Sequence, residues 1–320
     1  MILDQIQCNA SDVIVDTISS VRIKVTDRCS FKCFFCHHEG SINTNDLELD
    51  YSLRHSLERL RVELRITEAH LTGGEPTIYP HIIKLVDLLS KLGYRVKMTT
   101  NGQFSESLLK KLKEAGLKGL NFSVHTLNSD YLAKMHCPPR NSVWGRKALE
   151  KQINNIRVSM ELGLITKINT VVPGGTMIES VIPIIEFTKE RNLDLRILDD
   201  LSYRSTSIET IMEMLSSLGA KIEDVRVSDG SSGYSVGVVL EDGFRMRIKS
   251  IRQMILKSMC SYCDVREHCK EWFYGIRIEQ KEDRALARLC VHRQDYPAVH
   301  NLTEFFSSIQ YDELISLVGS

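Results

Sequence analysis

Hydrophobic positions in the first two thirds of the chain follow two rhythms that alternate with each other. Short segments carry apolar residues at every second position and predict strands, whereas longer segments carry them three or four positions apart and predict amphipathic helices. Strands are predicted at residues 21–25, 69–72, 94–100, 120–125, 165–172 and 193–198, and helices at 52–64, 82–92, 108–115, 147–162 and 178–191. This alternation is typical of an α/β fold with a parallel sheet.

The alternation of strand and helix stops near residue 200. One further helix is predicted at 207–218, and the run Asp229-Gly230-Ser231-Ser232-Gly233 indicates a turn at a domain boundary. Residues 236–240 and 244–248 predict a hairpin. We therefore expect four segments, namely an extension without a periodic pattern (1–17), the main α/β unit (18–200), a connecting segment (201–234) and a small carboxyl-terminal domain (235–320).

Composition and charge point to an ordinary globular protein. Of 320 residues, 42% are hydrophobic and 26% charged, and 41 basic residues balance 41 acidic ones. We therefore expect neither a nucleic-acid nor a membrane partner. No apolar run approaches the roughly 18 to 20 residues of a transmembrane helix, and the first residues lack the basic-then-apolar order of a signal peptide, so a cytoplasmic location is expected.

Cysteine usage suggests metal binding. The chain has nine cysteines, which in a cytoplasmic protein are better interpreted as metal ligands than as disulfides. Seven of them fall into two groups. The other two, Cys8 and Cys137, stand apart and are expected to be simply buried or mildly exposed.

The first group follows the predicted strand 21–25. Cys29, Cys33 and Cys36 have the spacing C-x3-C-x2-C, which lets one loop offer three thiolates to one inorganic cluster. A [4Fe–4S] cube normally takes four, so three would leave one iron open to a small molecule. The alternatives are a zinc knuckle or a chance group of core cysteines, although the spacing differs from the paired CxxC of zinc ribbons.

A second motif, Gly73-Gly74-Glu75-Pro76, follows the predicted strand 69–72. Two glycines allow the backbone to come close to a ligand, and Glu75 adds a carboxylate beside them. Alone, the motif is explained equally well by a tight strand-to-helix turn.

The cysteine motif resembles the cluster loop of radical S-adenosylmethionine (radical SAM) enzymes. The flanking Thr26-Asp27-Arg28 and His37-His38-Glu39-Gly40 resemble the molybdenum-cofactor branch typified by GTP 3′,8-cyclase. The resemblance implies a partial (βα)6 TIM barrel with a small carboxyl-terminal auxiliary-cluster domain. It also implies that SAM binds the open iron of a [4Fe–4S] cluster and is split to a 5′-deoxyadenosyl radical, which abstracts hydrogen from a substrate.

The resemblance also implies ligand contacts at the carboxyl ends of the strands, where α/β barrels carry their chemistry. The GGEP element of the family contacts the SAM amino group, Thr99, Thr100 and Asn101 match positions near the ribose, and Ser123 lies on the other flank. Each of these could also be a turn cap or a solvated strand end. The implied SAM site is Gly73, Gly74, Glu75, Pro76, Thr100, Asn101 and Ser123, and the implied substrate site is Arg22, Lys167, Asn169, Arg196 and Arg277.

The second cysteine group consists of Cys260, Cys263, Cys269 and Cys290. Four thiolates suit either a structural zinc ion or a second iron–sulfur cluster. Residues 275–278 and 288–292 resemble the carboxyl-terminal region of the family, which implies an auxiliary [4Fe–4S] cluster.

The sequence departs from the cyclase pattern at several places, two of which concern ligand binding. The cyclase supplies three cysteines to its auxiliary cluster and keeps one iron free for guanine, whereas Cys269 is a fourth candidate ligand here and would close the cluster. The basic positions before GGEP that grip the triphosphate are Glu68 and His70 in this chain. Because like charges repel by the order of a few kcal/mol in a partly buried site, a polar, singly anionic substrate is expected rather than GTP.

The expected function is a radical SAM reaction on a small nucleotide, nucleoside or sugar-like substrate, with a reductase or flavodoxin-type electron donor as partner. The alternatives are GTP 3′,8-cyclase, a peptide-modifying radical SAM enzyme and a non-catalytic metal-binding scaffold. No residue is assigned as catalytic, although Cys137, Tyr203 and Tyr234 are candidates for a radical quencher or proton donor. Each is explained more simply as a core or surface residue.

Overall fold

The computed structural model describes residues 13–16, 19–36, 45–172, 178–200, 207–228, 231–269 and 271–319. Several residues singled out in the sequence lie outside these ranges: Cys8, His37, His38, Glu39, Gly40, Tyr203, Asp229 and Gly230.

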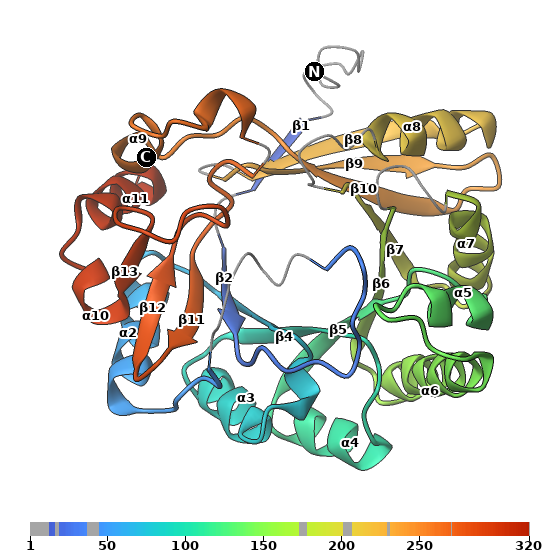
Figure 1. Cartoon of the computed structure of the whole chain (residues 1–320). Coiled ribbons are helices and arrows are strands. Elements are labelled where there is room, and N and C mark those ends of the chain that lie inside the picture. The colour runs from blue at the N-terminus through green and yellow to red at the C-terminus, as the bar shows by residue number, and fades with distance from the viewer. Residues whose placement is uncertain are drawn as a thin grey trace.

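A curved sheet organises the described part of the chain (Figure 1). The order of its strands is β1-β8-β9-β10-β7-β6-β5-β4-β3-β2-β11-β12-β13. Strands β2 to β7 are parallel and pair in sequence order. The strands are β1 (Val13–Asp16), β2 (Ser20–Lys24), β3 (Glu68–Thr72), β4 (Arg95–Thr100), β5 (Leu117–Ser123), β6 (Ile165–Val171), β7 (Asp194–Leu198), β8 (Lys221–Ser228), β9 (Gly233–Val239), β10 (Arg245–Ile251), β11 (Arg277–Lys281), β12 (Arg284–Arg288) and β13 (Val299–Asn301).

The larger helices of the first two thirds lie on the outer side of the curved sheet, while residues 25–36, which follow β2, lie on its inner side (Figure 1). The α-helices are α2 (Tyr51–Glu63), α3 (Ile82–Lys91), α4 (Glu106–Glu114), α5 (Ser129–Lys134), α6 (Ser142–Glu161), α7 (Val181–Glu190), α8 (Ser207–Ser217), α9 (Lys257–Cys260), α10 (Leu302–Phe305) and α11 (Ile309–Gly319). Short 3-10 helices are η3 (Pro76–Ile78), η5 (Ile178–Ser180) and η6 (Arg266–His268). Among the described helices, none combines the length and the apolar character needed to cross a bilayer.

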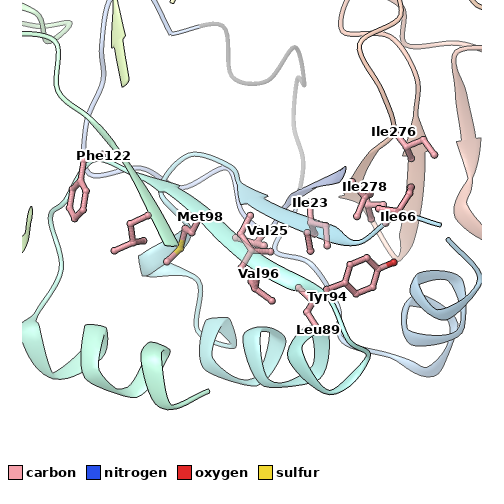
Figure 2. Close-up of a cluster of buried hydrophobic side chains, with 14 of the residues drawn as sticks. Ile23, Val25, Ile66, Leu89, Tyr94, Val96, Met98, Phe122, Ile276 and Ile278 are labelled. Atoms are coloured by element: carbon pink, nitrogen blue, oxygen red, sulfur yellow. The ribbon is translucent and has the colours of Figure 1, made fainter. Parts of the chain in front are cut away.

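The core lies between the sheet and the outer helices. Val96 and Met98 of β4 are fully buried and belong to the same hydrophobic cluster as Leu89 of α3 (Figure 2). The hydroxyl of Tyr94 donates a hydrogen bond to the carbonyl oxygen of Leu57, at 2.7 Å, and so ties β4 to α2. Alternate positions of these strands therefore supply the outward, apolar face that the pattern predicted.

The opposite face of the strands is polar and lines the inside of the barrel. The register of β2, β3 and β4 places Arg22, His70 and Lys97 side by side. The register of β6, β7 and β10 does the same for Asn169, Arg196 and Arg247. Because successive side chains of a strand point to opposite faces, burying the apolar row outward turns this charged row inward.

The prediction of an α/β fold with a parallel-dominated, partial barrel is confirmed, and so are its six strands. The predicted hairpin is β9 and β10. Helix α6 begins at Ser142, five residues earlier than predicted, because the side chain of Asn141 caps it by accepting a hydrogen bond from the Trp144 amide at 2.9 Å. The sequence pattern did not predict β1 or β8, which pair in parallel.

The strands that follow residue 200 join the barrel strands at both edges. Strand β10 pairs in parallel with β7, and β11 pairs in parallel with β2 through Arg277 and Arg22. A single sheet therefore runs through the described part of the chain. The division at residues 17, 200 and 234 stays a prediction.

Candidate active site at the carboxyl ends of the barrel strands

The loop with the first cysteine group leaves the carboxyl end of β2 and is fixed at its start. The fully buried Thr26 donates a hydrogen bond from its hydroxyl to Asp46 Oδ1 at 2.5 Å, and Arg28 pairs with Asp46 Oδ2 at 2.5 Å. The backbone amides of Gly74 and Glu75 donate to the carbonyl oxygens of Thr26 and Arg28, both at 2.8 Å. The cysteine loop and the GGEP segment are therefore one hydrogen-bonded unit.

The two glycines of GGEP are required by this contact. Gly73 has a φ of +147°, where side chains are disfavoured, and a Cβ atom there would lie 2.5 Å from the carbonyl oxygen of Thr26. A Cβ atom on Gly74 would lie 2.5 Å from the carbonyl oxygen of Asp27. The sequence suggested glycines that approach a ligand, and in the structure they approach the backbone of the cysteine loop.

Glu75 is a buried carboxylate whose two oxygens both accept hydrogen bonds. Oε1 accepts from the Thr77 amide (3.1 Å), the Thr77 hydroxyl (2.6 Å) and the Thr100 hydroxyl (2.8 Å), and Oε2 accepts from the Asn101 amide (2.6 Å). Burial raises the pKa of Glu75, whereas these hydrogen bonds lower it. Glu75 therefore links the GGEP segment to the carboxyl end of β4.

Asn101 connects this unit to the first cysteine. Its side-chain nitrogen lies 3.7 Å from Cys29 Sγ and 3.2 Å from Ser30 Oγ. Gln152 of α6 donates to the carbonyl oxygens of both Asn101 (2.9 Å) and Ser123 (2.8 Å). The implied SAM residues Thr100, Asn101 and Ser123 are thus brought together at neighbouring strand ends.

Gln152 and its neighbour Asn155 were missed by sequence reasoning. Asn155 donates to the carbonyl oxygens of Gly102 (2.8 Å) and Phe104 (3.0 Å), and both amides are buried. The sequence does contain a signal for them. The two amides lie three positions apart on a predicted helix, and the apolar residues around them indicate that they are on its buried face.

The remainder of the cysteine loop rests on the segment after α5. Cys33 and His136 form an isolated bridge, and the Lys32 amide donates to His136 Nδ1 at 3.3 Å. The rings of Phe31, His136 and Trp144 pack together, with centroids 4.3–5.3 Å apart. These aromatic rings give the loop a second support, separate from its contact with GGEP.

Burial raises the pKa of the Cys29 thiol to about 11 and that of Cys33 to about 12, and negative charge at Cys36 raises both. The three thiols are therefore within electrostatic reach of one another. Such thiols stay protonated at neutral pH unless a metal binds them, and a coordinating metal deprotonates them. The donor chemistry of this set fits an iron–sulfur cluster.

In the parts of the chain that the structure describes, no three Cys, His, Asp or Glu side chains converge on the position of a single ion. A [4Fe–4S] cube distributes its thiolates over separate irons and does not need such convergence.

The four cysteines of the second group are also brought together. Burial, together with charges at Cys290, Cys269 and Cys263, raises the pKa of the Cys260 thiol to about 11. Cys269 Sγ accepts a hydrogen bond from the Trp272 amide at 3.2 Å, and Cys290 accepts from the amides of Arg293 and His292. Amide donors around sulfur are a feature that tunes iron–sulfur clusters.

A cavity of about 870 Å³ lies between the amino-terminal parts of β2, β3, β4, β6 and β7 and the strands β8, β9 and β10. It reaches from the amino ends of the strands, at Ser20 and Arg95, to Lys249 and Tyr274. Lys249 pairs with Leu198, the last residue of β7, so this part of the cavity lies nearer the carboxyl ends. Eight basic and four acidic side chains line the cavity, which gives it an excess of positive charge.

The residues expected to bind substrate have different positions relative to this cavity. Lys167 and Arg196 line it, whereas Arg22, Asn169 and Arg277 are not part of its lining. Lys167 pairs with Asp194 at 2.5 Å, and burial lowers the pKa of Arg196. Glu68 also lines the cavity and pairs with Lys97 at 2.6 Å, while His70 Nε2 hydrogen-bonds the Thr99 hydroxyl at 2.7 Å.

The candidates for a radical quencher lie in different environments. Tyr234 lines the cavity, and burial raises its pKa. Cys137 is exposed, and its amide donates to the Lys32 carbonyl at 2.8 Å. Tyr274, which sequence reasoning did not consider, lines the cavity as well.

Comparison with known sequences gives one family and a set of similar proteins. The sequence model of the radical SAM superfamily matches residues 23–188. A probable GTP 3′,8-cyclase of Saccharolobus solfataricus is 36% identical over 159 residues, which are 48% of each chain. The GTP 3′,8-cyclase of Nautilia profundicola is 30% identical over 188 residues, 57% of this chain and 56% of that protein. The chain thus spans about half the length of the curated relatives that it matches.

Comparison with solved structures supports the fold. The structure of native anSMEcpe with bound AdoMet covers 94% of this chain and 84% of its own, with a TM-score of 0.55 and 16% identity. At this identity the likeness concerns the fold alone.

Proposed function

Because the chain belongs to the radical SAM superfamily, we propose that it reductively cleaves S-adenosylmethionine and abstracts a hydrogen atom from a small polar substrate. The observation that carries the proposal is the hydrogen-bonded unit of cysteine loop and GGEP segment, which presents three cysteines after the carboxyl end of β2, two of them, Cys29 and Cys33, desolvated. This is the end at which α/β barrels place their chemistry.

In this proposal Cys29, Cys33 and Cys36 hold a [4Fe–4S] cluster. When bound, the cluster supplies the electron that converts SAM to a 5′-deoxyadenosyl radical. The chain itself positions the reactants: Gly73, Gly74 and Pro76 shape the segment beside the loop, and Glu75 fixes it to Thr100 and Asn101. Gln152 then bonds to Asn101 and Ser123 and so fixes the separation between the carboxyl ends of β4 and β5.

We assign the second cysteine group to an auxiliary [4Fe–4S] cluster with four protein ligands. Support comes from the shared electrostatic environment of Cys260, Cys263, Cys269 and Cys290. With Cys269 as a ligand the cluster has no open iron, so it would anchor the carboxyl-terminal region and would not bind substrate. The segments proposed to form the barrel (18–200), the connection (201–234) and the auxiliary-cluster domain (235–320) follow from this assignment.

The proposed substrate is a nucleotide, nucleoside or sugar-like molecule with an anionic group. The cavity has the size of small-molecule sites, which range over roughly 300–1,000 Å³. Lys167 and Arg196 lie in its wall, with Arg22, Asn169 and Arg277 on neighbouring strands. The excess of basic side chains favours an anion.

GTP 3′,8-cyclase is the second candidate, because the curated relatives carry that name. The carboxylate of Glu68 in the cavity wall argues against a triphosphate. Because Lys97 is paired with this carboxylate, its ammonium group is not available to bind phosphate oxygens.

The test is anaerobic formation of 5′-deoxyadenosine by the reduced, cluster-loaded protein. The variant with Cys29, Cys33 and Cys36 all changed to Ala should lose this product down to the background of the reductant, because no thiolate would remain to hold the catalytic cluster. Iron bound at the second group should persist and would show that the variant is folded. The matched control is Cys137→Ala, which removes a thiol beside the same loop and should keep the activity.

Retained cleavage in the triple variant would overturn the assignment of the loop. Absence of cleavage in the cluster-loaded wild type would favour a metal-binding scaffold. Consumption of GTP in the same assay would make the cyclase the leading candidate.

A further inference from the structure

Tyr274 is held in one orientation by small groups around it. Its carbonyl oxygen accepts a hydrogen bond from Ser231 Oγ at 2.6 Å, and the next residue, Gly275, has a φ of +145°. A Cβ atom on Gly233 would lie 3.3 Å from Tyr274 Cε2, so the ring packs directly on the glycine backbone. The phenol therefore has a fixed place in the cavity wall.

Cations from four strands surround this ring. The guanidinium carbons of Arg22 on β2 and Arg277 on β11 lie 5.9 and 5.5 Å from the ring centroid. Lys249 on β10 has the largest electrostatic effect on the phenol, and Arg196 on β7 interacts with it as well. The opposing acid is Glu271, whose carboxylate is paired with Arg277.

The positive charge around Tyr274 lowers its pKa by more than burial raises it. Burial alone raises a phenol's pKa, as it does for Tyr234 in the same cavity. For Tyr274, Lys249 together with Arg22 and Arg277 instead lowers the pKa to about 8, below the usual value near 10. Part of the population therefore carries a phenolate near neutral pH.

We propose that Tyr274 is the acid–base group of the cavity, and that an anionic ligand drives a proton onto its oxygen when it binds. The inference deepens the proposed function and rests on the cavity being the substrate site. Two of the cations that act on the phenolate, Lys249 and Arg196, also line the cavity, so an anion that enters would share them and weaken their hold on the phenolate. The proton comes from solvent, and the phenolate forms again when Tyr274 passes that proton to the substrate.

The effect of an anion on the protonation of Tyr274 can be measured without SAM or a reductant. A negative result would therefore be distinguishable from a failure of the proposed radical chemistry. Anaerobically purified protein labelled with ¹³Cζ-tyrosine is titrated from pH 6.5 to about 10.5, with and without inorganic pyrophosphate as the anionic probe. The resonance of Tyr274 is identified by its loss in Tyr274→Phe. Its midpoint should lie near 8 and should move to higher pH with pyrophosphate.

Lys249→Met supplies an independent variant. Removing this cation should move the Tyr274 midpoint toward 10, whereas Lys110→Met, on the exposed side of α4, should leave it unchanged. A wild-type midpoint near 10, or a midpoint that pyrophosphate does not move, would overturn the proposal.

Discussion

At the scale of single residues, the position of the cysteine loop depends on buried polar groups that are hydrogen-bonded to neighbouring segments. Glu75 is the clearest case, because a carboxylate removed from water is tolerated only when donors replace the water. Four donors from Thr77, Thr100 and Asn101 do so here. The motif suggested a SAM contact for Glu75, and that role stays a prediction beside the structural one.

Glu75→Gln should lower the free energy of unfolding by about 1–3 kcal/mol, because the amide NH2 that replaces one oxygen would face N–H or O–H donors. Urea denaturation with the protein kept anaerobic measures it. Glu58→Gln on the exposed face of α2 is the matched control and should change the free energy by less than about 1 kcal/mol, since its pair with Arg54 is solvent-exposed. Equal effects of the two substitutions would contradict the structural role of Glu75.

At the scale of elements, the cysteine loop owes its position to the segment after β3. The amides of Gly74 and Glu75 bond the loop backbone, and no side chain fits between the two segments. The packed rings of Phe31, His136 and Trp144 support the loop at a second place. The three cysteines are thus presented by a loop clamped between two elements far apart in sequence.

Gly74→Ala should displace this loop, since the added Cβ would meet the carbonyl oxygens of Asp27 and Arg28. We expect faster hydrogen exchange over residues 25–36 and less iron retained after anaerobic gel filtration. Gly243→Ala is the control: its φ is +85°, but no atom lies within 4 Å of the added Cβ. It should cost only the backbone strain of about 1–2 kcal/mol and leave the loop's exchange unchanged. Similar loop exchange in both variants would contradict the clamp.

The elements of the barrel were predictable because each depends on local periodicity. The six strands, their outer helices and the hairpin of β9 and β10 all follow from apolar spacing. The parallel pairing of β10 with β7 and of β11 with β2 was not predictable, since a pairing partner distant in sequence leaves no local pattern. Tyr274 was missed for the same reason: its cations come from β2, β7, β10 and β11.

At the scale of the whole molecule, one extended sheet joins the barrel strands to the strands on either side of the second cysteine group. The barrel strands carry the first group at their carboxyl ends, and β11 and β10 flank the barrel at β2 and β7. The segment with Cys260 and Cys269 lies between β10 and β11 in the chain, and Tyr274 extends from it into the cavity wall. Under the proposed function, the chain therefore carries two clusters, one with an iron open to SAM and one closed by four cysteines.

The most direct test is the iron and sulfide content of the anaerobic protein, together with the EPR spectrum of its reduced form with and without SAM and with and without GTP. We predict about eight irons per chain and two EPR signals. SAM should alter the first signal, which should disappear on loss of Cys29, Cys33 and Cys36. GTP should leave the second signal unchanged. An iron content unaffected by loss of these three cysteines, with no signal responsive to SAM, would contradict the proposed function.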